Sequence, residues 1–402
     1  MGQPLAIAPI TVPIIGNSAA QGTTFQIHLA TVTFIAGAAV LAVLYEGLGT
    51  RGSARHERLA HGIAHGIESV FAWATTWAVF AIVFLLGLYP GLFAVLVRIF
   101  FWPWVAILII WAVLTVLAYT YYFTWNRLQH RRALHMAIGG TYAASQLAFV
   151  ALIVSLSSYQ LTPGNPRSLS SALLNPTWAA EWTHRFVAVL GYSGFILAGF
   201  AAYRLLRPLS QEDRSYWGWV AHQGVLWGVI ALLLQPAASG WFYTTQVKNG
   251  SPGAFGNMMG MGPTAWYFLV QLGLLFALFF SANVYMWRSM ARSGASSKWM
   301  RYVPWAIVAY VIFWGVALIP GDEPLGAMFP WKAIALAVLV VATCFILAVY
   351  VRSRTLLTWT TGFGVPEIAS FSAAALSLGL IIIMGVIREG ARGGELIYGV
   401  LK

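Results

Sequence analysis

Long apolar stretches alternate with short polar connections along the whole chain of 402 residues. Most of these stretches have about twenty residues, the length at which a helix crosses a bilayer. The pattern predicts about ten transmembrane helices, at 26–48, 63–87, 91–123, 134–157, 183–205, 216–236, 264–288, 302–320, 331–351 and 367–387. The third stretch is longer than one crossing requires and contains Arg98 and Pro103, so we expect it to begin with a short interfacial turn.

These spans divide the chain into five regions. We expect an outer-surface N-terminal segment (1–25), a four-helix transmembrane bundle (26–157), an outer loop (158–182), six further transmembrane helices (183–387) and an outer C-terminal tail (388–402). The N-terminal segment lacks the basic start of a signal peptide. The predicted fold class is therefore an all-α, polytopic integral membrane protein.

The composition agrees with this fold class, because 59% of the residues are hydrophobic and only 8% are charged. A soluble protein of this length does not need such a composition. The one cysteine, Cys344, lies in an apolar run, which excludes disulfides and cysteine-ligated metal or iron–sulfur sites. A c-type heme is excluded because the chain has no Cys-x-x-Cys-His motif.

The basic residues concentrate in every second connection between the predicted spans. With the N-terminus outside, the inner connections contain Arg51, Arg55, Arg58, Arg127, Arg131, Arg132, Arg204, Arg207, Arg214, Arg288, Arg292, Lys298, Arg301, Arg352 and Arg354. Inner loops carry such an excess in multi-pass proteins, so both termini are expected on the outer side of a bacterial inner (plasma) membrane. The net charge of +12 is then explained by the orientation of the chain in a lipid bilayer and does not indicate binding to a nucleic acid.

Two histidines lie near the predicted outer face. His184 follows an Asn175-Pro176 turn and an acidic and aromatic shoulder, and it stands at the head of the apolar run 186–203. His28 lies in a span that is otherwise free of charge up to Tyr45. An imidazole at such a place needs a partner, and a neutral histidine is a good axial ligand for heme iron. The alternative for His184 is a hydrogen bond to a neighbouring helix or to Glu181, and for His28 a hydrogen bond across helices.

Other histidines allow more than one interpretation. His61 and His65 are one helical turn apart, a spacing that suits two ligands of one metal or one ligand for each of two groups. A wetted helix end explains the same spacing. We expect His130 to be solvated in its basic loop and His135 to be interfacial at the start of the fourth span.

Two further candidates could serve a cofactor. His222 lies about 9 Å inside the sixth span, in its inner half, too far from His184 to share a heme. It either hydrogen-bonds a neighbouring helix or serves a second cofactor or a quinone headgroup. Met258, Met259 and Met261 cluster before the seventh span, where a thioether could be the sixth ligand of an outer heme, or where a flexible interfacial loop could lie.

Three motifs follow one another along the chain: His28 with Glu46 eighteen positions on, then Trp125-Asn126-Arg127-Leu128 before His135-Met136, and then Asn175, Pro176, His184, Gly191 and Tyr192. This ordered set resembles subunit I of the cytochrome bd quinol oxidases. The set covers roughly the first half of the chain. The resemblance implies a bd-type fold, one or two hemes b, His184 as the axial ligand of a low-spin heme and His28 as the ligand of a high-spin heme.

The family pattern breaks at its oxygen site. Leu269 stands where the family has the methionine that pairs with the low-spin heme histidine, and Ala106 and Leu114 stand where it has two glutamates. Leu318 falls at the heme-ligating glutamate, and Gln235-Pro-Ala-Ala-Ser-Gly-Trp replaces the motif that opens a much longer quinol-binding loop. The candidate intramembrane acids are Glu46, Glu68 and Glu367. Reducing oxygen requires protons delivered by ionisable groups, so the chain resembles the oxidase scaffold without its oxygen site.

We therefore expect a heme-b subunit that exchanges electrons between the quinone pool and an outer-face redox partner without reducing oxygen. A divergent bd-type quinol oxidase is the alternative in the same class, and a heme-free membrane anchor or transporter is the alternative in another. The two termini offer apolar, weakly structured surface on which a periplasmic cytochrome c or iron–sulfur subunit could dock. They could equally lie flat on the lipid headgroups.

Overall fold

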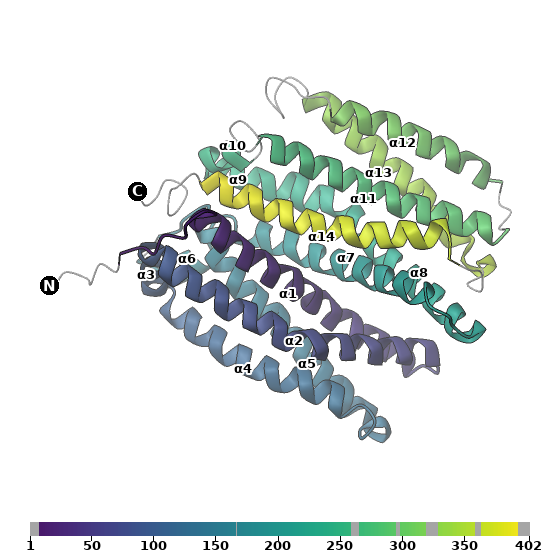
Figure 1. Cartoon of the computed structure of the whole chain (residues 1–402), viewed down its shortest axis with the longest axis horizontal. Coiled ribbons are helices and arrows are strands. Elements are labelled where there is room, and N and C mark those ends of the chain that lie inside the picture. The colour runs from purple at the N-terminus through teal and green to yellow at the C-terminus, as the bar shows by residue number, and fades with distance from the viewer. Residues whose placement is uncertain are drawn as a thin grey trace. The chain divides into compact units, whose positions relative to one another are not determined.

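The computed structural model describes residues 8–165, 167–258, 265–294, 298–318, 329–357 and 363–392. Every regular element in these ranges is a helix (Figure 1). Nine helices of the described chain are long and apolar enough to cross a membrane, judged by length and composition. The expected all-α, polytopic membrane fold is confirmed. The expected span 302–320 corresponds to a shorter apolar helix of 15 residues, α12 (Val303–Ala317).

The chain forms two compact units. The first comprises Met1–Phe186, Ala238–Gly256 and Gly385–Lys402, and the second comprises Val187–Ala237 and Asn257–Met384. The first unit is thus larger than the four-helix bundle expected at 26–157. It also takes in the start of one long helix, the end of another and the segment that follows the sixth span.

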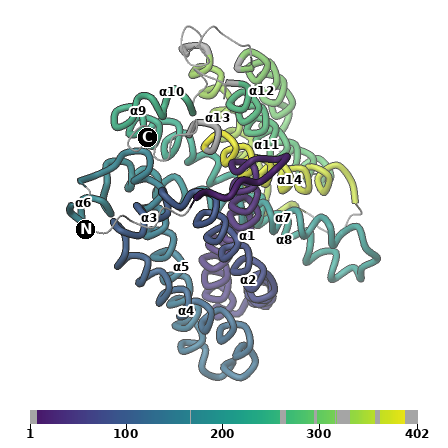
Figure 2. Tube along the Cα trace, turned by 60° about the vertical axis from the view of Figure 1, so that its left-hand side comes forward, coloured from purple at the N-terminus to yellow at the C-terminus, as the bar shows by residue number. Residues whose placement is uncertain are grey.

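Four long helices build the first unit, and they lie together as one bundle in Figure 2. They are α1 (Gly16–Gly49), α2 (Ala54–Leu88), α4 (Phe101–Phe123) and α5 (Arg132–Tyr159). The helix α1 packs against both α2 and α5, and its small residues Ala38 and Ala39 are fully buried. The helix α1 begins ten residues before the expected span, after a turn that Gly16 permits with its φ of 77°.

A separate helix, α3 (Pro90–Ile99), stands where a short interfacial turn was expected before α4. Proline is favourable at its first position because its ring presets the helical φ. The residues around α3 form a hydrophobic core with α2, α4, α5 and the short helix α6 (Leu169–Leu173). Its buried members are Leu85, Leu92, Leu96, Phe100, Ile107, Leu156, Tyr159 and Ala172.

The second unit contains most of α7 (Trp178–Leu205), α8 (Gln211–Gln235), α11 (Ala265–Arg292), α12, α13 (Phe329–Arg352) and most of α14 (Val365–Arg392). Glycines bring α7 and α8 into backbone contact. A Cβ added to Gly194 would lie 2.7 Å from the Gly224 carbonyl oxygen, and one on Gly224 would lie 2.7 Å from the Ala198 nitrogen. Small residues allow this close approach between membrane helices. The contact between α7 and α8, here called the α7–α8 seam, is therefore made by backbone atoms.

A π-helix, Pro236–Tyr243, continues α8 and leads into α9 (Thr244–Gly250) and α10 (Pro252–Met258). No helix is expected from the hydropathy pattern in this part of the chain, which that pattern assigns to an outer connection. Proline at the junction has no N–H to donate, which favours a break in the regular α-helical hydrogen bonding. π-Helical segments are rare and occur frequently at functional sites.

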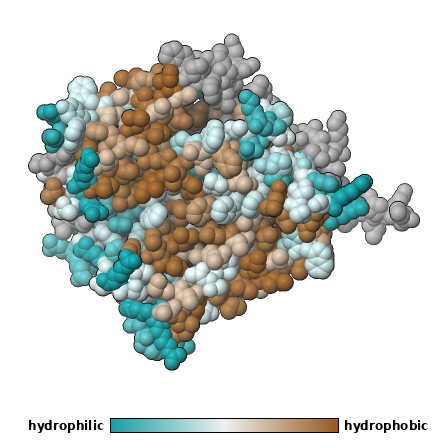
Figure 3. Space-filling model, turned by 180° about the vertical axis from the view of Figure 1, so that it is seen from behind, coloured by the Kyte–Doolittle hydropathy of each residue, from teal (hydrophilic) through white to brown (hydrophobic). Residues whose placement is uncertain are grey.

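Large apolar side chains remain exposed along the helices, among them Val79, Phe80, Val83, Leu108, Ile109 and Val116 on α2 and α4. Figure 3 shows one face of the protein on which hydrophobic residues spread over a wide area and hydrophilic residues gather toward the margins. A bilayer requires this distribution, because apolar side chains meet the lipid tails and polar ones meet the headgroups.

Candidate functional site

A buried hydrogen-bond network fixes the turn that precedes α7. The Asn175 side chain donates to the Ser158 hydroxyl at 2.9 Å and to the carbonyl oxygens of Ala172 and Ser155 at 3.0 and 3.2 Å. The hydroxyls of Thr162 and Thr177 are 2.6 Å apart. The asparagine of the Asn175-Pro176 turn thus ties the start of α7 to the end of α5, which holds the first turns of α7 in a defined place.

The π-helix supplies the partners of His184. Nδ1 of His184 hydrogen-bonds the Ser239 hydroxyl, and the imidazole stacks on Tyr243 with ring centroids 5.5 Å apart and 7° between the planes. Ser239 and Tyr243 are four positions apart, so the π-helix presents both to one side chain. His184 is half-buried at this place. The sequence analysis considered a hydrogen bond from His184 to Glu181, but Nδ1 of His184 bonds Ser239 instead.

Glu181 instead binds two arginines. Its Oε1 accepts hydrogen bonds from Arg185 at 2.7 and 3.0 Å, from Arg388 at 3.0 Å and from the Ser157 hydroxyl at 2.6 Å. Arg388 also donates to the Ser157 carbonyl oxygen at 2.6 Å. The Glu181 side chain is only 1% exposed, and its Oε2 is buried without a hydrogen-bond partner. Arg388 belongs to α14, which extends to Arg392, so the tail expected from 388 begins within a helix.

His28 lies on α1 and faces α2. Its Nδ1 is 3.0 Å from the Ala74 carbonyl oxygen. Because a carbonyl only accepts, Nδ1 carries the hydrogen and Nε2 keeps its lone pair in the neutral ring. The hydrogen bond across helices considered from sequence is therefore present, and it leaves one nitrogen in the form that a metal requires.

His222 belongs to the second unit, where it is buried. Its Nδ1 is 2.6 Å from the Tyr350 hydroxyl, so the pair links α8 to α13. This contact agrees with the expectation of a hydrogen bond to a neighbouring helix. A buried polar group in a membrane domain is stable only with such a partner, and the pairing explains why the span tolerates a histidine.

The remaining candidates are placed as follows. His65 is exposed, 3.7 Å from a Glu68 carboxylate oxygen, and stacks on Tyr122, as does His61. Met258 ends α10 and is half-buried, whereas Met259 and Met261 lie outside the described residues. Among the described residues no group of three or more His, Cys, Asp or Glu side chains is arranged to hold a metal ion. A heme needs only one or two protein ligands, so this finding bears on His61 and His65 rather than on His184 or His28.

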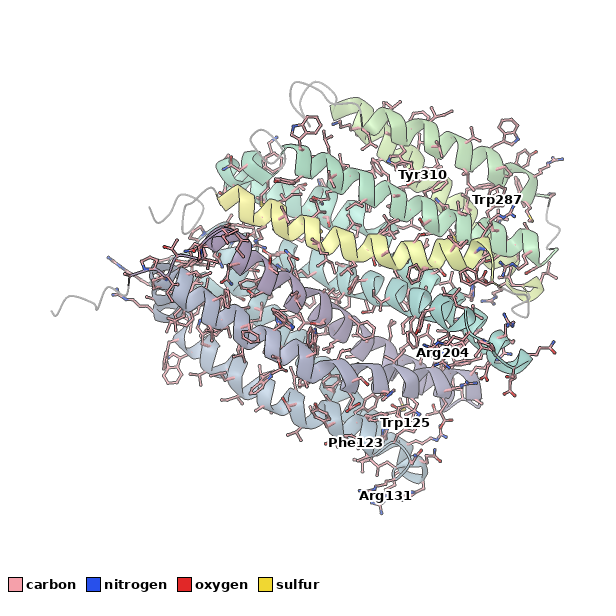
Figure 4. All side chains as sticks on the ribbon, in the orientation of Figure 1. Phe123, Trp125, Arg131, Arg204, Trp287 and Tyr310 are labelled. Atoms are coloured by element: carbon pink, nitrogen blue, oxygen red, sulfur yellow. The ribbon has the colours of Figure 1, made fainter. Side chains whose placement is uncertain are left out.

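His135, which was expected to be interfacial, has its side chain buried between α1, α4 and α5. Nδ1 of His135 is 2.7 Å from Glu46 Oε1, and Nε2 is 2.9 Å from the Tyr121 carbonyl oxygen. The Tyr121 hydroxyl donates to the other oxygen of Glu46 at 2.8 Å. Trp125 packs edge-on against the His135 ring near the end of α4, where Figure 4 labels it together with Phe123 and Arg131.

This triad uses every nitrogen and carboxylate oxygen of its members. Nε2 of His135 must carry hydrogen because its partner is a carbonyl, and a further proton lies between Nδ1 and the Glu46 carboxyl. His135 therefore has no nitrogen left for a metal, and Glu46 is held at both oxygens. Both residues stabilise the bundle at the predicted inner end.

No protein-family model matches this chain, and no curated protein matches it in sequence. Among solved structures, the chain is similar to the bd oxidase from Geobacillus thermodenitrificans, with a TM-score of 0.51 and 14% sequence identity. The similarity covers 94% of this chain and 98% of the other. At this identity the likeness shows the fold alone, and it confirms the expected bd-like arrangement of helices.

Proposed function

We propose that this protein is a heme-b-containing subunit of a respiratory membrane complex. It exchanges electrons between the quinone pool and an outer-face redox partner, and it does not itself reduce oxygen. The similarity of its fold to a bd oxidase supports a respiratory membrane protein of that kind. The observation that carries the proposal is His184, held at the start of α7 by Ser239 and Tyr243.

The surroundings of both histidines fit heme ligation. A metal-binding histidine normally donates its second nitrogen to a carbonyl, carboxylate or water, which fixes the ring and its tautomer. The Ala74 carbonyl does this for His28, and the Ser239 hydroxyl can do it for His184 by accepting the Nδ1 hydrogen. Heme b supplies a one-electron carrier. The chain's own residues orient the two imidazoles for it, and Tyr243 fixes the plane of one.

The acids of the membrane domain support electron transfer without oxygen reduction. Glu46 is engaged by His135 and Tyr121, and Glu367 is engaged by both terminal nitrogens of Arg292 at 2.7 and 2.8 Å. The sequence between Tyr89 and Gln129 contains no acidic residue at all. Protons for oxygen reduction would have to pass through ionisable groups. Glu46 and Glu367 are engaged in contacts between helices, whereas Glu68 lies 3.7 Å from the exposed His65 of its own helix.

The expected setting is the inner membrane of a bacterium, with both termini on the outer side. A periplasmic cytochrome c or iron–sulfur subunit would dock there and exchange electrons through the heme at His184. The sixth ligand of that heme stays a prediction for Met258, Met259 or Met261.

The test is heme content measured by pyridine hemochrome, together with the optical spectrum of the reduced protein. We expect His184→Ala to remove one heme while the protein remains inserted. His130 is an exposed histidine, and we expect His130→Ala to leave the heme content unchanged. Undiminished heme in His184→Ala would refute this ligand. A parental protein without heme would favour the heme-free anchor or transporter, and a far-red heme d band would favour the oxidase.

A further inference from the structure

Glu181, Arg185 and Arg388 form an ion cluster one helical turn from His184. Two guanidinium groups contact one carboxylate, at 2.7 Å from Arg185 and 3.0 Å from Arg388, so the three side chains together carry one net positive charge. The arginine side chains are about one-quarter exposed, at 25% and 23%, and the carboxylate is buried. Solvent and salt therefore screen these charges less than they screen surface charges.

The helix fixes the distance between this cluster and the candidate heme ligand. Residues three apart on a helix have Cβ atoms about 5–6 Å from each other, so Glu181 and His184 are neighbours on α7. Arg185 directly follows His184, and Arg388 reaches Glu181 from α14. In a low-dielectric setting, single charges at such distances change the energy of a redox centre.

We propose that Glu181, Arg185 and Arg388 set the reduction potential of the heme bound by His184. This inference rests on the proposed function. Reduction adds one electron and lowers the charge at the iron by one, so a net positive cluster favours the reduced form and raises the potential. Each side chain then has a defined sign: Glu181 lowers the potential, and the two arginines raise it.

The direction in which each substitution shifts the reduction potential distinguishes an electrostatic role of the cluster from a purely structural one. The same contacts tie α7 to the end of α14 and to the end of α5, through Arg388 and the Ser157 carbonyl oxygen. If the cluster only held these helices together, removing either partner would loosen the same place and disturb the heme in the same direction. An electrostatic role requires opposite shifts.

The experiment is a spectroelectrochemical redox titration of the full-length protein in lipid nanodiscs. We expect Glu181→Gln to raise the midpoint potential of the His184 heme and Arg388→Gln to lower it. The double variant Glu181→Gln/Arg388→Gln restores the charge balance and is expected to titrate close to the parental protein. Arg388→Lys keeps the charge but not the paired guanidinium geometry, and we expect it to retain the parental potential.

The matched control is Arg167→Gln, which removes an exposed, solvent-screened charge and is expected to leave the potential unchanged. Shifts of Glu181→Gln and Arg388→Gln in the same direction, or equal shifts in Arg388→Gln and Arg388→Lys, would overturn the inference while the proposed function stands. If Glu181→Gln does not assemble, the two Arg388 variants decide alone. A parental protein without heme overturns both the inference and the proposed function.

Discussion

Gly139 on α5 is the point at which the buried triad can be perturbed most selectively. A Cβ added there would lie 2.5 Å from Cε2 and 2.9 Å from Cζ of Tyr121, inside van der Waals contact. The ring cannot retreat freely because its hydroxyl bonds Glu46 at 2.8 Å. Overpacking of this kind destabilises by about 1–3 kcal/mol. Losing a hydrogen bond to a charged group adds about 1.5–3 kcal/mol if the hydroxyl is displaced.

Gly140 provides a matched control, because it is the next residue of the same helix and a Cβ there meets no atom within 4 Å. Gly→Ala improves helix propensity equally at both positions, by about 1 kcal/mol, so this contribution cancels in the comparison. We expect Gly139→Ala to be less stable than Gly140→Ala by about 2.5–6 kcal/mol when the hydroxyl is displaced, and by about 1–3 kcal/mol when it is not. Equal stability of the two variants would show that the triad tolerates movement of Tyr121.

The assay is reversible unfolding in mixed detergent micelles, followed by tryptophan fluorescence. Tyr121→Phe shows how much of the stability loss in Gly139→Ala comes from the steric clash and how much from the lost hydrogen bond, since it keeps the ring and removes the hydroxyl. In that background we expect Gly139→Ala to lose only the overpacking part, because the hydrogen bond is already absent. An unchanged effect of Gly139→Ala in the Tyr121→Phe background would assign the whole loss to the clash.

Three further outcomes follow from the fold and the proposed function. His28→Ala is expected to remove a spectral component separate from that of His184, and a double variant identical to His184→Ala alone would mean one shared site or a structural His28. Deleting residues 389–402 is expected to release partner subunits without loss of heme, as checked by co-purification; retention of every partner would contradict the docking role. Gly224→Ala is expected to destabilise the α7–α8 seam by at least about 1–3 kcal/mol in the same unfolding assay, because its Cβ would meet backbone atoms, whereas Gly253→Ala has open space and should not.

The apolar pattern predicted where the membrane helices lie but not where they end. The helix α7 begins at Trp178 rather than at 183, because the polar residues Glu181 and Arg185 satisfy each other within its first turns. The hydropathy pattern placed Arg185 inside the expected span and Glu181 outside it, since it cannot show that the two residues are paired. The helix α1 also begins earlier than its expected span, at Gly16.

The candidate site was predicted only in part, because its contacts join residues distant in sequence. His135 and Glu46 are 89 positions apart, and nothing in the local sequence around His135 distinguishes a buried partner from a wetted helix end. The partners of His184 were missed for a different reason. Ser239 and Tyr243 occupy a π-helix, whose spacing differs from that of an α-helix, and the Pro236 that precedes them was the one available signal.

Three buried carboxylates of the described chain differ in how many of their oxygens are hydrogen-bonded. Both oxygens of Glu46 and both oxygens of Glu367 are hydrogen-bonded, by His135 and Tyr121 in one case and by Arg292 in the other. Glu181 is bound at one oxygen only. Burying a carboxylate oxygen without a hydrogen-bond donor is costly, and the two arginines at the other oxygen offset that cost for Glu181. This unpaired oxygen lies one turn from His184, at the same end of α7 that the proposed function assigns to electron exchange.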